Sequence, residues 1–143
     1  MTNGKRAKMQ NFTGSCLCRA MTYKSKTAAL RTFSFHREHC RKCSGAPYLT
    51  NIFVKEATLD IQGNLKSYVH QSESGNRTTK KFCEKSGCQM FSFNEGRPGL
   101  VRIHAGKVSE LEMVKPQGDV WVSKTIPSIK MDETLNQFEK NFT

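Results

Sequence analysis

Residues 35–47 read Phe-His-Arg-Glu-His-Cys-Arg-Lys-Cys-Ser-Gly-Ala-Pro, and residues 48–54 continue as Tyr-Leu-Thr-Asn-Ile-Phe-Val. The first stretch places two thiols and two imidazoles within thirteen residues. The second stretch is rich in β-branched and aromatic side chains, which indicates a strand. The centre of the chain is therefore predicted to carry a reactive, polar segment that leads directly into a strand.

Similar short strand segments lie on both sides of this centre. Period-two alternation and β-prone residues predict strands over residues 19–24, 30–35, 57–61, 65–70, 78–82, 89–93, 99–106 and 120–122. The connection at 62–64 contains Gly63, so the segments on either side are expected to form a hairpin. Helix is expected only after Cys40, at 109–112 and from Asp132 onward. The sequence predicts a mainly β domain of short antiparallel strands with little helix.

The length and composition indicate one folded domain. A chain of 143 residues with 36% hydrophobic residues can bury a single core. We expect a flexible basic tail over 1–11, the domain over 12–131, and a short helix or tail over 132–143. The sequence has no apolar run long enough to span a bilayer and no apolar stretch typical of a secretion signal. A cytoplasmic protein without a membrane partner is the resulting expectation.

The chain is strongly basic. Lys and Arg number 23 against 12 acidic residues, which gives a formal net charge of +11. The cations are spread from Lys5 to Lys140, without an Arg-rich helix or an aromatic RNA-binding motif. This distribution favours a solvated surface and a small anionic substrate over a nucleic-acid partner.

The six cysteines form three close pairs along the chain: Cys16 and Cys18, Cys40 and Cys43, and Cys83 and Cys88. In a reducing compartment, clustered cysteines indicate metal or thiol chemistry rather than disulfides. Cys-x-Cys can chelate one ion from an extended strand, and a second pair can complete a tetrahedral zinc site. The first and third pairs are therefore predicted to hold structural zinc.

Three ordered motifs carry a resemblance to a known family: residues 14–23 around Cys16, residues 40–47 after Cys40, and Phe82-Cys83 with Gly87. Together they resemble the glutathione-dependent formaldehyde-activating enzymes, also called the centromere protein V family, in their fungal form. The resemblance implies a β-tent fold, carbon–sulfur lyase activity and two zinc ions. One zinc would be structural. The other would be catalytic and associated with the addition of the glutathione thiol to formaldehyde.

The chain departs from that family at both sites. Alignment on Cys40 sets the other two catalytic cysteine positions on Phe35 and Arg37, and neither side chain can bind zinc. In the late motif the second cysteine position falls on Ser86, and Cys88 lies two residues further. The structural site therefore either persists with Cys88 or is replaced by hydrophobic packing. The central zinc is either lost or rebuilt from His36, Cys40 and Cys43, with or without His39.

The candidate catalytic residues are His36, His39, Cys40 and Tyr48. Neighbouring cations lower a thiol pKa, and histidine transfers protons near neutral pH. We expect a small-molecule enzyme of carbon–sulfur lyase ancestry with a changed acid–base reaction, namely isomerisation, cyclisation or addition to a carbonyl. Its substrate would be anionic or a thiol adduct, and a homodimer is compatible with the sequence. The alternative is a catalytically inactive zinc-binding scaffold or binding protein of the same fold.

Overall fold

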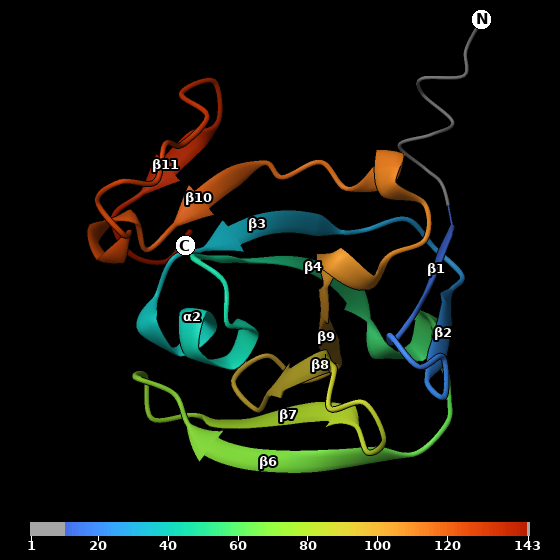
Figure 1. Ribbon diagram of the computed structural model, residues 1–143. Helices are drawn as coiled ribbons and strands as arrows, with labels where there is room; N and C mark the ends of the chain where they lie inside the picture. The colour runs from blue at the N-terminus through green and yellow to red at the C-terminus, as the bar shows by residue number, and fades with distance from the viewer. Residues whose placement is uncertain (1–10, 143) are drawn as a thin grey trace, which may run out of the picture.

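A computed structural model describes residues 11–142, which form two sheets (Figure 1). The smaller sheet has the order β1-β2-β5, with bounds Phe12–Ser15, Thr22–Ser25 and Leu59–Gln62, and its strands are antiparallel. Glycine is required at position 14, because a Cβ there would collide with the ring of Tyr23 on the paired strand. This close approach lets Tyr23 lie 3% exposed in the core.

The larger sheet has eight strands in the order β11-β10-β3-β4-β9-β8-β7-β6. Their bounds are β3 Arg31–Phe35, β4 Leu49–Lys55, β6 Leu65–Gln71, β7 Arg77–Cys83, β8 Gln89–Asn94, β9 Leu100–His104, β10 Gly118–Val120 and β11 Asn136–Phe138. In the order β3-β4-β9-β8-β7-β6, each strand is antiparallel to its neighbour. Strand β10 is parallel to both β3 and β11. The mainly β prediction is confirmed, with a parallel edge that local sequence patterns did not indicate.

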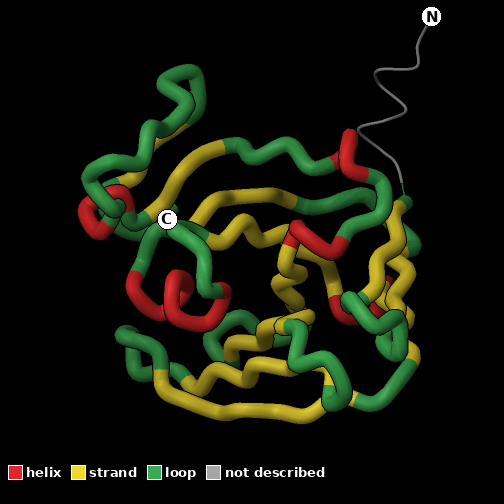
Figure 2. The backbone as a smooth tube through the Cα atoms, in the orientation of Figure 1, coloured by secondary structure: helices red, strands yellow, loops and turns green. Residues whose placement is uncertain are grey.

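The helix α2, Glu38–Ser44, lies between the β3–β4 and β6–β7 parts of the large sheet (Figure 1). It begins after extended Arg37 and ends at Gly45, whose φ of 71° is the left-handed conformation that glycine adopts without strain. An ion pair of 3.1 Å between Glu38 and Lys42 supports its exposed face. Figure 2 shows that the other helical segments are single turns, at Glu56–Thr58, Ala105–Lys107, Leu111–Met113 and Val122–Lys124.

Strand β4 separates two apolar clusters. Ile52 and Val54 point into the larger one, together with residues such as Met21 and Phe91. Phe53 points the other way, into a smaller cluster. The other buried members of the smaller cluster are Phe33, Phe35, Cys40, Leu49 and Val120. Both faces of β4 are therefore buried, which explains why residues 48–54 lack a polar face.

Two local predictions are wrong. Segments 57–61 and 65–70 form no hairpin, because β5 pairs with β2 while β6 pairs with β7. Gly63 has a φ of 112°, and a Cβ there would collide with the carbonyl oxygen of Ala20, so the connection carries the chain between sheets. The expected helix after Asp132 is replaced by β11, whose Phe138 packs against Phe33 with ring centroids 6.2 Å apart.

The basic tail predicted for 1–11 lies outside the described residues, except for Asn11. Strand β1 begins at the next residue, Phe12. Within residues 11–142, every helix is too short or too polar to cross a membrane.

Candidate functional site

Three cysteine sulfurs from two distant parts of the chain meet at one point. Cys16 and Cys18 follow β1, and Cys83 ends β7. Their Sγ atoms all lie within 4.8 Å of one another, with 3.5 Å between Cys16 and Cys18 and 3.7 Å between Cys18 and Cys83. The fold thus brings three of the four cysteines named for the structural site together, and Cys88 lies outside this group.

Backbone amides donate to these sulfurs. The N–H of Met21 donates to Cys16 Sγ and that of Ser86 to Cys83 Sγ, both at 3.4 Å. Burial raises the pKa of Cys16, but the amide of Met21 and the hydroxyl and thiol groups around it outweigh burial and lower the pKa to about 6. The pKa of Cys83 is also lowered, by Ser86 through its side chain and its amide. The surroundings favour thiolates, which are the form that binds zinc.

Cys88 lies at the edge of this cluster. The N–H of Cys83 donates to the carbonyl of Cys88 at 2.9 Å, and Gly87 takes a φ of 74° in the turn between them. The Sγ of Cys88 accepts the N–H of Leu17 at 3.5 Å, but it is not within 4.8 Å of all three other sulfurs. The hydroxyl of Ser86 is buried and has no hydrogen bond of good geometry within residues 11–142. Three thiols therefore suit a zinc ion, with Cys88 and Ser86 as the nearby groups for the fourth position.

The sequence left open a central metal site rebuilt from His36, Cys40 and Cys43, with or without His39, but the fold does not bring their ligand atoms within 4.8 Å of one another. Within residues 11–142, only Cys16, Cys18 and Cys83 bring three His, Cys, Asp or Glu ligand atoms so close together. Cys40 is 2% exposed and belongs to the smaller apolar cluster, because α2 packs that face against the sheet. Of the two alternatives that the sequence left open, loss of the central zinc therefore agrees better with this fold than a rebuilt site.

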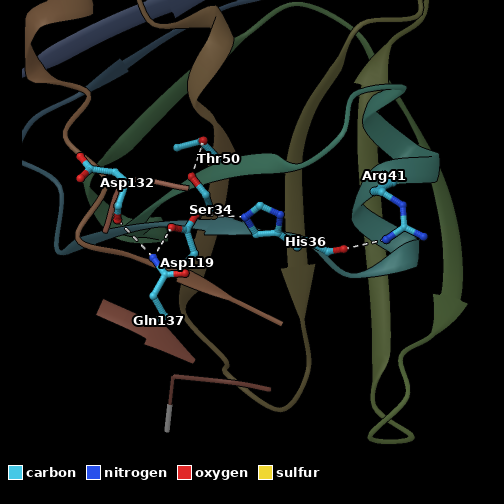
Figure 3. A network of polar contacts seen from close by, with 7 residues as sticks. All are labelled: Ser34, His36, Arg41, Thr50, Asp119, Asp132 and Gln137. Atoms are coloured by element: carbon cyan, nitrogen blue, oxygen red, sulfur yellow. Dashed lines mark hydrogen bonds and ion pairs between the residues drawn. The ribbon is translucent and has the colours of Figure 1, made fainter. Parts of the chain in front are cut away.

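His36 is held by a polar network rather than presented to a substrate (Figure 3). Its ring is fully buried, and Nε2 lies 3.0 Å from Oδ1 of Asp119 on β10. The other oxygen of Asp119 accepts the amide N–H of Gln137 at 2.9 Å. Arg41 donates to the carbonyl of His36 at 2.7 Å, and the ring of Tyr48 covers the imidazole at 4.9 Å. These contacts join β10, β11 and α2, so His36 connects three elements.

His39, in the first turn of α2, lines a cavity of about 460 Å³. The residues that line it are His39, Lys42, Cys43, Tyr68, His70, Gln71, Lys80 and Gln89. The rings of His39 and His70 meet edge to face with centroids 5.4 Å apart. The sequence marked His39 as a candidate but treated His70 as a packing or surface residue, because nothing local indicates that β6 faces α2.

The charges at this cavity are set by burial. Burial lowers the pKa of His70, and the nearby charge of Lys80 lowers it further. Nδ1 of His70 lies 3.2 Å from the carbonyl of Gln71, to which it donates, so the lone pair of Nε2 is free. Burial also raises the pKa of Cys43 and lowers that of Lys80. The cavity thus holds a neutral imidazole and a protonated thiol near neutral pH.

A neighbouring cavity of about 530 Å³ separates the end of α2 from the turn around Cys88. Tyr48, which is 40% exposed, lines it together with Cys43, Lys107 and His104. His104 is 2% exposed, and its Nε2 has no hydrogen-bond partner within residues 11–142. The fold therefore brings together only His36 and Tyr48, whose ring centroids lie 4.9 Å apart. Cys40 is buried in the smaller apolar cluster, and His39 lines a different cavity from Tyr48.

The comparisons with known proteins agree with this fold. A model of the glutathione-dependent formaldehyde-activating enzyme family matches residues 11–124. The chain belongs to this family. A crystal structure of a Rhodobacter sphaeroides protein superposes with a TM-score of 0.55 at 17% identity, over 73% of this chain and 96% of that one, and supports the fold. No protein in the curated set matches.

The family resemblance implies two zinc ions, and the residues present fit only one of them. The thiols of Cys16, Cys18 and Cys83 fit a structural zinc in type and spacing. At the central position, Phe35 offers no donor atom, and the guanidinium of Arg37 lies over the ring of Trp121. The central residues do not fit the family's catalytic zinc.

Proposed function

We propose that this family member is a small-molecule enzyme that transfers protons at the cavity between α2 and strands β6 and β7. The observation that carries the proposal is the pair of imidazoles, His39 and His70, with ring centroids 5.4 Å apart at the wall of this cavity. Two imidazoles at one cavity can act as base and acid in turn. The reaction class is isomerisation, or addition to a carbonyl, by proton transfer.

His70 has the features of the base. Its lowered pKa keeps the ring neutral near pH 7, and donation from Nδ1 to the Gln71 carbonyl leaves Nε2 able to accept a proton. His39 is placed to return a proton, because its ring meets that of His70. Cys43 is not the nucleophile, since its raised pKa keeps the thiol protonated.

The cations at this cavity favour an anionic substrate. Lys80 is 9% exposed, and no carboxylate lines the cavity, although Lys42 of α2 pairs with Glu38 outside the lining at 3.1 Å. A carboxylate or phosphate beside a carbonyl would be attracted by Lys80, and its ammonium would stabilise the negative charge of an enolate. The reaction proposed here differs from carbon–sulfur lyase chemistry, because Phe35 and Arg37 provide no ligands for the central zinc.

The test is hydrogen–deuterium exchange at the carbon next to a carbonyl. We would incubate the protein in D2O with pyruvate, acetoacetate or dihydroxyacetone phosphate and follow the α-proton signals by NMR. Exchange in the presence of wild-type protein should fall about a hundredfold in His39→Gln and in His70→Gln. Lys66→Gln, on the same strand but outside the cavity lining, should leave it unchanged.

A specific observation also favours the second candidate, a zinc-binding scaffold without catalysis. The thiols of Cys16, Cys18 and Cys83 form a site that needs no cavity, while His36 and Cys40 are buried. The exchange experiment separates the two. Exchange that is absent from wild type, or that persists in both histidine variants, contradicts the enzyme proposal. Absent exchange with zinc still bound supports the scaffold.

A further inference from the structure

A cavity of about 400 Å³ lies where the family's central zinc ligands are missing. Phe35 and Arg37, which take the places of two zinc-binding cysteines, both line it. Arg102 on β9 and Arg97 in the turn before β9 line it as well. The only carboxylate of its lining is that of the exposed Glu73. Three guanidinium groups therefore share one cavity with a single acidic residue.

Each guanidinium lies over at least one aromatic ring. The Cζ-to-centroid distances are 5.5 Å for Arg37 over Trp121, 4.9 Å for Arg97 over Phe142, and 5.1 and 5.2 Å for Arg102 over Phe35 and Phe53. A guanidinium that stacks by its face keeps its N–H edge available for a planar or tetrahedral oxyanion. Within residues 11–142, none of the three forms an ion pair or donates a side-chain hydrogen bond; Arg41 alone among the arginine side chains donates one.

Two buried N–H groups of the lining have no partner. These are Nε of Arg37 and Nε1 of Trp121, and neither finds an acceptor within residues 11–142. Buried donors without acceptors are costly, so they indicate a missing acceptor. Trp121 is also held at a φ of 60°, a conformation that side chains larger than glycine rarely adopt and that occurs preferentially at functional sites.

The like charges in the cavity repel one another. Burial lowers the pKa of Arg102 to about 10, and the charges of Arg37 and Arg97 contribute in the same direction. With a pKa of about 10, Arg102 remains cationic at neutral pH. An anion between the three guanidinium groups would relieve this repulsion and supply the missing acceptors.

We propose that this cavity binds an oxyanion, the phosphate or carboxylate group of a small molecule, on the N–H edges of Arg37, Arg97 and Arg102. Polar side chains of the same wall, Ser72 and Asn76 among them, can donate to its remaining oxygens. The site is independent of the proton-transfer proposal, because it shares no lining residue with the His39 cavity. Oxyanion binding requires no catalysis.

The test uses Trp121 as a reporter, because it is the single tryptophan of the chain and lines the cavity. Inorganic phosphate and malonate would be titrated separately into the full chain at constant ionic strength, with chloride as the balancing anion. Trp121 fluorescence and isothermal calorimetry would follow binding. The comparison of the two anions distinguishes a phosphate site from a carboxylate site.

Saturable binding of one of the two anions, weakened about tenfold or more by Arg37→Gln and by Arg97→Gln, is the expected result. The matched control is Arg31→Gln, which removes the same charge from a guanidinium 5.3 Å from the Phe142 ring but outside the cavity, and it should change affinity less than about twofold. Two variants are used so that a folding defect in one does not decide the outcome. Binding that is absent for both anions, that does not saturate, or that weakens equally in the control overturns the proposal.

Discussion

His104 should make the stability of this protein fall on mild acidification. Its side chain is buried beside β4, and burial, together with the charges of Lys107 and Lys80, lowers its pKa from 6.5 to about 3. The unfolded chain therefore takes up a proton near pH 6.5, while the folded chain resists protonation down to about pH 3. The contribution of His104 to stability is complete above pH 6.5 and is lost progressively as the pH falls between these two values.

The size of the effect follows from the two pKa values. Between about pH 7 and about pH 5, a histidine with these values removes about 2 kcal/mol from the free energy of unfolding. With a urea m-value of about 2 kcal/mol per molar, the unfolding midpoint falls by about 1 M. His104→Gln removes the titrating group, so this part of the pH dependence should disappear in the variant.

Urea unfolding followed by circular dichroism at a series of pH values measures the effect. The comparison is the difference between wild type and His104→Gln, because carboxylates and other histidines titrate in both. His70→Gln serves as the comparison. The pKa of this less buried histidine is also lowered, so its removal should change the pH dependence in the same direction but by less. If the midpoints of wild type and His104→Gln fall in parallel between pH 7 and pH 5, His104 is not buried in its neutral form and the reasoning is refuted.

Two further predictions concern the polar network and the cysteine cluster. Asp119→Ala should lower the free energy of unfolding by about 3 kcal/mol, because it leaves the buried Nε2 of His36 unpaired. Gln137→Ala, at the exposed end of the network, should lower it by about 1 kcal/mol or less in the same urea assay. Equal losses in the two variants would contradict this order. Elemental analysis of protein purified without chelator should find about one zinc per chain. The zinc should be lost in Cys18→Ser and kept in Cys40→Ser, because Cys40 lies in an apolar cluster. Zinc that is kept in Cys18→Ser and lost in Cys40→Ser would show that the metal binds at the central residues instead.

Local sequence patterns were enough to locate most strands. The period-two alternation of 30–35 and the β-branched and aromatic residues of 48–54 correspond to β3 and β4, because both patterns are local properties of a strand. The alternation did not report burial, since four consecutive residues of β3 are buried. The failed hairpin at Gly63 shows the limit of such patterns. A glycine between two strand-like segments indicates a turn, but it does not say whether the second strand joins the same sheet.

The candidate site was predictable where spacing alone carries the information. Each close pair of cysteines can be read from the sequence, because the type of ligand and the short spacing within a pair are local properties. Two such pairs in one chain indicate a zinc site. The catalytic candidates His36 and Cys40 were chosen for their chemistry, yet the fold buries both, since β10 covers one and α2 turns the other inward. The roles proposed for His70 and Arg102 could not be predicted from local patterns. They depend on tertiary folding, which places His70 of β6 at the same cavity as α2 and Arg102 of β9 over the ring of Phe35.

The resemblance places zinc-binding cysteines at positions 35 and 37, and with Phe35 and Arg37 there instead the central cavity has the opposite charge. A zinc ion held by three thiolates carries a net charge of about −1, because each thiolate contributes one negative charge. Here the same region carries the guanidinium groups of Arg37 and Arg102, which no carboxylate of residues 11–142 neutralises through an ion pair. A neutral carbonyl or a thiol gains little from such a field, whereas an oxyanion gains charge-assisted hydrogen bonds. The change in these two residues therefore favours a different ligand, not merely the loss of a metal, and the Arg37→Gln titration measures that preference directly.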